Sequence, residues 1–251
     1  MLSSQSARSN EPVIESYCLG NAWESCFIYF DGTITKGSAN KFKEVLEYSE
    51  GPSVYLNSPG GDLQEALEIG RLIRKAGKQT DIGSLTGVDT FEGTIWDGSN
   101  RPMEAPKNGK CESACAYAFM GGQERRLGSG KLGLHRFYST ERGLTSDAAQ
   151  FISGLLVEYM VEMGVDARLF LAASKEGADG MYYVSEAEAL DYAIVTPYGY
   201  GDVFLEPYLG GVVAASRRLD PPKAYDQVKQ VTFFCEEGRP KVMLTADAGN
   251  L

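Results

Sequence analysis

Histidine is nearly absent from this sequence: His135 is the single imidazole among 251 residues. Paired metal-binding motifs are absent as well, because none of the five cysteines forms a CxxC pair: Cys18, Cys26, Cys111, Cys115 and Cys235. Zinc sites in proteins are usually built from such pairs together with histidines. The tyrosines and phenylalanines also have no spacing typical of a cofactor site. We therefore expect neither a metal ion nor a bound cofactor.

Positive charge is scarce. Twenty-four Lys and Arg stand against 34 Asp and Glu, which gives a net charge of −10, and no run of five basic residues occurs. Nucleic acids and anionic membranes are bound through clustered Lys and Arg, so we expect neither as a partner. No stretch of about 18 apolar residues is present to span a bilayer. A Walker-type phosphate loop is missing too, so the chain itself should not hydrolyse ATP.

Residues 1–12 lack the basic and apolar segments of a secretion signal, although a signal removed earlier would leave the same start. Five cysteines permit up to two disulfides and a spare thiol, or five free thiols, and their number alone leaves the compartment open. We expect at least one disulfide, because Cys18 and Cys235 fall in the less regular terminal regions.

Strands and helices alternate over residues 26–195, which predicts an α/β fold. We divide the chain into an N-terminal extension (1–23), a main domain (24–198) and a β-rich C-terminal extension (199–251). Within the main domain, residues 85–110 are rich in Gly, Asp, Asn and Pro and predict an inserted hairpin or flap. Ser38, Thr145 or Ser146, and Ser185 are the expected N-caps of helices, and Ser185 begins a capping-box pattern.

Three segments bear chemistry. Ser113 begins a short alanine-rich stretch that predicts a buried helix, so its hydroxyl would lie among unpaired helix N–H groups such as that of Ala114. Gly60 and Gly61 end a turn, 57–61, that follows an apolar strand, and two residues without Cβ permit close backbone approach. His135, 22 positions after Ser113, is the one side chain suited to act as its base.

Each segment also has an ordinary structural explanation. Ser113 could be a simple N-cap, residues 57–61 a tight strand-to-helix turn, and His135 a core residue. Two other nucleophilic arrangements are less suitable. Cys115 lies two positions along the helix, which rotates it away from Ser113, and Lys131 could form a serine–lysine dyad, although His135 already fills the matching place.

Taken together the segments resemble the Clp protease proteolytic subunit and its ClpP-like relatives. The resemblance rests on the strand and turn of residues 54–61, on Ser-Ala-Cys-Ala followed by Gly121-Gly122, on Leu134-His135, and on residues 183–195. It covers residues 24–198 and implies a ClpP/crotonase-like spiral of repeated ββα units with a C-terminal β extension. Cys111, Cys115 and residues 199–251 look closer to periplasmic ClpP-like proteins, so a periplasmic or secreted location is favoured over a cytoplasmic one.

The resemblance implies a serine peptidase that acts on peptide or protein substrates. Ser113 would be the nucleophile and His135 the general base. Gly60, Gly61 and Ala114 would form the oxyanion hole. It also implies a homo-oligomer. An ATPase partner is doubtful, because residues 199–251 have no counterpart in the cytosolic subunit and the segment before Ser113 is longer than in the family.

One family residue is missing. The family's aspartate falls at Met181, which cannot orient an imidazole, and the nearest carboxylate is Asp179. We expect Asp179 to complete the triad through a shifted loop. Met181 also supports an alternative in which the chain is a weak or inactive ClpP-like protein that binds peptides as a scaffold. Acyl-CoA chemistry on the same fold is a third possibility, although it usually relies on paired carboxylates or peptide N–H donors.

Overall fold

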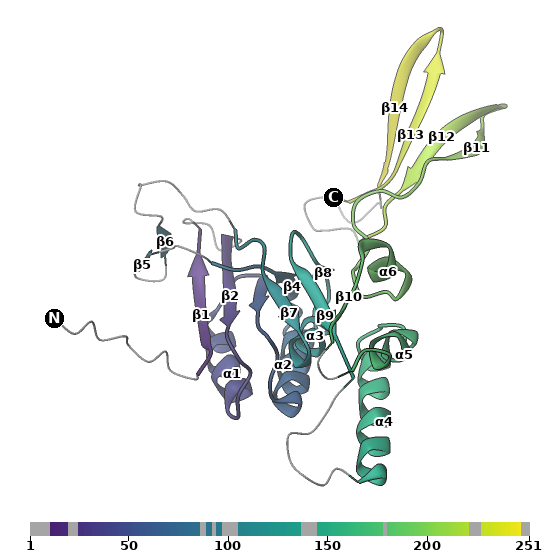
Figure 1. Ribbon diagram of the computed structural model, residues 1–251. Coiled ribbons are helices and arrows are strands. Elements are labelled where there is room, and N and C mark those ends of the chain that lie inside the picture. The colour runs from purple at the N-terminus through teal and green to yellow at the C-terminus, as the bar shows by residue number, and fades with distance from the viewer. Residues whose placement is uncertain are drawn as a thin grey trace. The chain divides into compact units, whose positions relative to one another are not determined.

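A computed structural model gives the arrangement of the chain (Figure 1). The structure describes residues 11–19, 25–85, 89–91, 94–96, 105–136, 145–177, 180–220 and 227–246. The chain divides into two compact units, Met1–Val195 and Thr196–Leu251. Our expected boundary, between residues 198 and 199, lies three residues beyond this division.

The first unit contains a seven-stranded sheet in the order β5-β6-β1-β2-β3-β4-β8. Strands β2, β3, β4 and β8 are parallel, β1 is antiparallel to β2, and β5 and β6 form a hairpin within the segment expected to be an insertion. The strands are Val13–Cys18 (β1), Cys26–Asp31 (β2), Ser53–Asn57 (β3), Gln79–Ile82 (β4), Asp89–Phe91 (β5), Thr94–Trp96 (β6) and Arg125–Arg126 (β8).

Strand β1 differs from our expectation. We assigned residues 1–23 to an extension outside the main domain, and this is wrong for residues 13–18, which pair with β2 along their whole length. Glu15 and Ser16 interrupt the apolar pattern, so the sequence does not look like a strand, yet Ile14 and Tyr17 are buried. A disulfide joins Cys18 to Cys26 at the end of this pairing.

Helices α1 (Ser38–Tyr48), α2 (Leu63–Lys75) and α3 (Ala114–Met120) lie side by side, with α2 in the middle (Figure 1). Asp62 is the N-cap of α2 and accepts a hydrogen bond from the Glu65 N–H at 3.1 Å. The expected N-cap of α1 is wrong by one residue, since the cap is Gly37, whose φ of 94° suits glycine. All seven residues of α3 are buried, as its alanine-rich sequence predicts.

A second, three-stranded sheet positions the segments with candidate chemistry. Its order is β10-β9-β7, with β7 (Lys110–Glu112) parallel to β9 (Lys131–Leu134), and β10 (Tyr182–Tyr183) antiparallel to β9. Side chains alternate between the faces of a strand, so the side chains on one face of this sheet point into the core and are buried. These are Cys111, Leu132 and Leu134. The opposite face, which we call the outer face, contains Glu112, Gly133 and Tyr183.

Three more helices complete the first unit within the described residues: α4 (Ser146–Glu162), α5 (Arg168–Ser174) and α6 (Glu186–Asp191). The capping box of α6 at Ser185 and Glu188 is confirmed, and Thr145 is the N-cap of α4. Arg125 ties these helices to the core by donating hydrogen bonds to carbonyl oxygens of Met120, Gly122, Met163, Ala193 and Ile194. Burial lowers the pKa of Arg125 to about 10, with the Arg74 charge as a second cause, so the guanidinium remains charged at neutral pH.

The second unit is a four-stranded antiparallel sheet in the order β11-β12-β13-β14. Its strands are Phe204–Tyr208 (β11), Gly211–Arg217 (β12), Val228–Glu236 (β13) and Arg239–Ala246 (β14). The β-rich character expected for the C-terminus is thus observed. The protein is a mixed α/β chain, and none of the helices in its described part is long and apolar enough to cross a membrane.

Candidate active site

The turn of residues 57–61 is bonded on both edges. On one edge, Ile34 N–H donates to the Gly60 carbonyl and Asp62 N–H donates to the Ile34 carbonyl, each at 2.8 Å. On the other edge, Ser58 pairs with β7 through its N–H and its carbonyl. The Asn57 side chain adds bonds to Asp31 Oδ1 and from the Lys110 N–H. These bonds hold the turn rigidly beside the start of α3.

Ser113 joins β7 to α3 in a strained backbone conformation, with φ 56° and ψ −123°. Such a positive φ is uncommon for a residue other than glycine, and it costs of order 1–3 kcal/mol. The Ser113 side chain makes no capping hydrogen bond to α3, and the residue is only half-buried. Ser113 is thus the N-cap residue of α3 by position, but its hydroxyl does not cap the helix.

A disulfide between Cys111 and Cys115 spans this strained turn. One cysteine lies on β7 and the other in the first turn of α3, so the covalent link holds the strand end and the helix start on either side of Ser113. Both cysteines are fully buried. A cysteine in a disulfide has no thiolate, so the alternative of Cys115 as nucleophile is wrong. The expectation of at least one disulfide is confirmed, and Cys18 is bonded to Cys26. The reason given for Cys235 is wrong, because Cys235 is a free, exposed thiol.

Gly60 lies directly against the Ser113 turn. A Cβ atom placed on Gly60 would lie 2.7 Å from Ser113 Cβ and from the Glu112 carbonyl oxygen, and 2.9 Å from Ala114 N. The two segments approach this closely because glycine has no side chain. The Gly60 N–H donates to Ser58 Oγ at 3.1 Å, which corrects our expectation that Gly60 serves as an oxyanion donor.

Two amides beside Ser113 remain available. Ala114 is the first residue of α3, so its N–H has no carbonyl one turn earlier in the helix. Ile34 forms hydrogen bonds with the Gly60 carbonyl and the Asp62 N–H, on either side of Gly61. The Gly61 N–H therefore points away from Ile34, to the edge of the turn where Ser58 pairs with β7. Among the described residues neither N–H has a protein acceptor. A pair of unpaired amides near one hydroxyl is the arrangement that stabilises an oxyanion.

His135 is brought beside Ser113 by the parallel pairing of β7 and β9. Glu112 is opposite Gly133, and the Ser113 N–H donates to the Gly133 carbonyl at 2.9 Å. His135 follows β9 directly, so neighbouring-strand geometry puts its Cα roughly 6 Å from that of Ser113. No hydrogen bond joins the two side chains. Alternation along β9 places the imidazole on the outer face with Gly133.

The imidazole is oriented by a backbone carbonyl. His135 Nδ1 lies 2.8 Å from the Arg136 carbonyl oxygen. A carbonyl only accepts hydrogen bonds, so this contact requires the proton on Nδ1 and leaves the lone pair on Nε2. That is the tautomer a general base needs. The structure thus supplies an Nδ1 partner that the sequence could not reveal.

Met181 lies where the resemblance places an aspartate. Antiparallel pairing sets Tyr182 opposite Leu134 and Tyr183 opposite Gly133, so the next position sets Met181 opposite His135. The Met181 side chain lies over Gly133, since a Cβ on that glycine would lie 2.8 Å from Met181 Sδ. An apolar thioether therefore lies on the same face as the imidazole. Asp179, our expected third residue, lies outside the described residues.

Charged groups of the outer face gather around Tyr183, and one of them, Glu112, directly precedes Ser113. The Tyr183 hydroxyl donates to Glu112 Oε1, which raises the pKa of Tyr183, with desolvation as the second cause. The Lys131 ammonium lies over the Tyr183 ring, and Lys131 pairs with Lys110, four positions along β9 from His135. Lys131 is therefore too far from Ser113 for the serine–lysine dyad.

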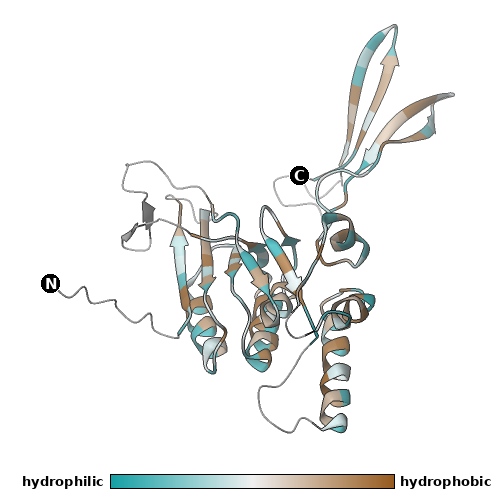
Figure 2. Ribbon diagram, viewed as in Figure 1, coloured by the Kyte–Doolittle hydropathy of each residue, from teal (hydrophilic) through white to brown (hydrophobic). Residues whose placement is uncertain are grey.

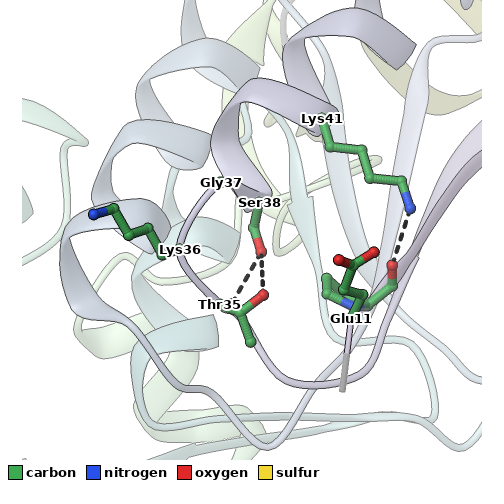
Figure 3. A pocket seen from close by; sticks show the side chains of 7 residues that line it. Glu11, Thr35, Lys36, Gly37, Ser38 and Lys41 are labelled. Carbon is green, nitrogen blue, oxygen red and sulfur yellow. Dashed lines mark hydrogen bonds between the residues drawn. The ribbon is translucent and has the colours of Figure 1, made fainter. Parts of the chain in front are cut away.

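A cavity of about 220 Å³ lies at the start of α1 (Figure 3). It is lined by Glu11, Pro12, Thr35, Lys36, Gly37, Ser38 and Lys41. The helix N–H groups that could attract an anion are already bonded, because the Glu65 carboxylate accepts from the N–H groups of Gly37 and Ala39. The cavity contains none of the residues assigned to the Ser113 site.

Comparison with known proteins does not assign the chain to a family. A scan against protein-family models found no match, and a search of curated protein sequences found none either. Across the described ranges, no group of three or more His, Cys, Asp or Glu side chains could hold a metal ion. The interpretation of the site therefore rests on its geometry and on the sequence resemblance.

Replacement of Gly60 by alanine tests the tight approach. We expect the free energy of unfolding to fall by about 2–4 kcal/mol, because the new Cβ strikes backbone atoms and φ is 95°. Gly37→Ala is a matched control, since Gly37 has a φ of 94° but no atom within 4 Å of the position that a Cβ would take. Urea unfolding of both variants measures the difference. Equal losses would mean that the contact with Ser113 is unimportant.

Proposed function

We propose that the protein is a serine hydrolase, and specifically a peptidase that acts through Ser113. The observation that supports this most is the strained, uncapped Ser113 beside two unpaired amides and the only imidazole of the chain. Backbone strain of this kind persists only where the surrounding structure enforces it, and it concentrates at functional sites. A strained serine between a strand and a helix also presents the nucleophile in another large class of hydrolases.

The geometry suggests the following steps. Ser113 Oγ attacks the carbonyl carbon of a peptide while His135 Nε2 accepts the hydroxyl proton. The carbonyl oxygen becomes negative and is held by the N–H groups of Gly61 and Ala114, each such donor contributing about 3–4 kcal/mol to transition-state stabilisation. The imidazolium then protonates the departing amine. Water, deprotonated by His135, attacks the acyl-enzyme. The bond from Ser113 Oγ to the acyl carbon breaks, the imidazolium returns its proton to Ser113 Oγ, and the carboxylate product leaves.

The wider proposal follows from the sequence resemblance. We infer a ClpP/crotonase-like spiral, peptide or protein substrates, and assembly into a homo-oligomer. An ATPase partner and a cofactor are not part of the proposal. Two disulfides, one of them across the Ser113 turn, favour an oxidising compartment such as the periplasm or the cell exterior, because thiols are kept reduced in the cytosol.

Covalent labelling with a fluorophosphonate tests the nucleophile. We expect the wild type to gain one adduct by intact mass, on a peptide that contains Ser113, and the Ser113→Ala variant to gain none. Ser153→Ala is a matched control, because Ser153 Oγ bonds the Ala149 carbonyl on α4, outside the site. Unchanged labelling of the Ser113→Ala variant would refute the proposal.

A second candidate function is a binding scaffold that uses the surface around Ser113 without efficient turnover. Met181 favours it, since a thioether in the position opposite His135 cannot stabilise an imidazolium. The two candidates differ in a measurable way. A scaffold would bind peptides with equal affinity in the wild type and the Ser113→Ala variant, and it would form no acyl-enzyme in a stopped reaction examined by mass spectrometry.

A further inference from the structure

The sheet of the second unit has one face without charge. Strand register places Leu205, Ala214, Phe233 and Val242 in a single row across all four strands. Because alternate residues of a strand share a face, seven more residues belong to the same side. They are Pro207, Val212, Ser216, Val231, Cys235, Pro240 and Leu244. We call these eleven residues the apolar face. Its one hydroxyl, on Ser216, is bonded to the Gly201 carbonyl.

The apolar face is open to solvent in the isolated chain. Exposure reaches 73% for Leu205 and 68% for Val212, and it is 46% even for the central Phe233. Val242 and Leu244 on β14 are also exposed. Figure 2 shows brown apolar segments between teal hydrophilic ones along these strands. A scattered apolar residue needs no explanation, but a contiguous exposed patch of this kind usually marks an interaction site.

The opposite face mixes charged and polar side chains with apolar ones such as Phe234 and Met243. Arg217 lies over the Phe204 ring and donates to Gln230 Oε1, and Gln230 in turn donates to Glu206. An ion pair joins Lys241 to Glu236. Val213, Ala215 and Thr232 on this face are buried, so this side of the sheet is already covered. An antiparallel sheet normally packs its exposed apolar face on another layer.

We propose that a second copy of this chain supplies the missing layer, with the two apolar faces packed in a two-fold symmetric sandwich. The size of the face is suitable. Eleven positions, with strands about 4.8 Å apart and alternate residues about 6.7 Å apart, cover roughly 350 Å² of flat sheet, and the side chains that stand on it add to the area that can be buried. Stable, specific complexes bury about 800 Å² on each partner.

The chemistry of the face favours a second copy over a different partner. A partner that recognises charge would find none among the eleven residues. A two-fold contact places the uncharged row of one copy against the same row of the other copy. The chain therefore needs no second, complementary surface for this contact. The chain has a net charge of −10, and an uncharged contact surface also limits repulsion between copies. This inference is independent of the proposed hydrolase activity.

Solution mass is the first test. We expect the full chain to behave as a dimer or a multiple of a dimer by light scattering, and the Phe233→Asp, Val242→Asp double variant to shift toward the mass of one 27.3 kDa chain. Thr245→Asp is the matched control, because Thr245 is exposed on the same strand but lies on the opposite face. Far-UV circular dichroism of each variant separates loss of assembly from loss of folding.

Cys235 gives an independent test that needs no substitution. It is the free thiol of the apolar face, whereas the other four cysteines are in disulfides. Without added reductant, its reaction with a soluble aryl disulfide should slow as protein concentration rises. We expect about fivefold protection at a total chain concentration of about ten times the dissociation constant of the dimer, where about one fifth of the chains remain monomeric, and no such protection in the double variant.

Three results would overturn the proposal. The first is a monomeric mass at every concentration up to on the order of 100 µM, well above the micromolar range of weak specific dimers. The second is Cys235 protection that does not depend on concentration, which would mean that the chain covers the face itself. The third is an unchanged mass for the double variant. A monomer that floats with neutral phosphatidylcholine vesicles would instead identify a lipid surface as the occupant.

Discussion

Replacement of His135 by alanine is expected to lower kcat by about three to four orders of magnitude, the upper part of the range for removal of a general base. KM should change little, because the imidazole accepts a proton and does not bind the substrate. No other imidazole exists in the chain to substitute for it. Hydrolysis of an activated ester or peptide, followed across pH, measures the effect.

Two further observations make the His135 result specific. Imidazole added to the buffer should restore part of the activity of the His135→Ala variant, which a purely structural role would not permit. The Arg136→Ala variant should retain activity, because it keeps the backbone carbonyl that accepts the Nδ1 proton. A His135→Ala variant within threefold of the wild-type rate, roughly 0.7 kcal/mol in barrier height, would exclude His135 as the base.

A carboxylate at position 181 is expected to raise kcat. The Arg136 carbonyl holds the imidazole in the required tautomer, but it has no full negative charge to stabilise the imidazolium formed in the reaction. A hydrogen bond to a charged group contributes about 1.5–3 kcal/mol, so the Met181→Asp variant should be about ten- to a hundredfold faster. Steady-state hydrolysis by purified wild type and variant gives the ratio.

Met181→Asn is the matched control for this gain. Asparagine has nearly the shape of aspartate but no charge, so its kcat should remain near that of the wild type. Both variants uncover Gly133, over which Met181 lies, and should lose similar thermal stability. Equal rates for the two variants would contradict the placement of position 181 beside the imidazole. A large gain from a nearly inactive wild type would support the scaffold as the native role.

Local patterns in the sequence predicted most of the elements around the site. The amphipathic spacing of α2, the alanine-rich α3 and the capping box at Ser185 depend on neighbours within one or two turns. The turn at residues 57–61 was predictable for the same reason. Strand β1 was not, because its polar residues mask the alternation and its stability comes from pairing with β2.

The site itself could be predicted only as a set of residues. Ser113 and His135 become neighbours through the pairing of β7 with β9, and Met181 joins them through β10. Two hydrogen bonds of the site have no sequence signal, because they depend on backbone direction. One runs from the Gly60 N–H to Ser58 Oγ, and the other joins His135 Nδ1 to the Arg136 carbonyl. The Cys111–Cys115 disulfide had a weak sequence signal, because the two cysteines lie four positions apart across a strand-to-helix turn.

By itself, the sequence determined the residue types and the local elements: one imidazole, a serine before a buried helix, a glycine turn after a strand, and a β-rich C-terminus. Such features arise from short-range hydrogen bonding and side-chain sterics, which act between residues close in the chain. Only the tertiary structure decided that Ser113 is strained and uncapped, and which sheet face of the second unit is left open. Strand pairing joins residues far apart in the chain, and the hydrophobic pattern of each strand alone does not specify its partner.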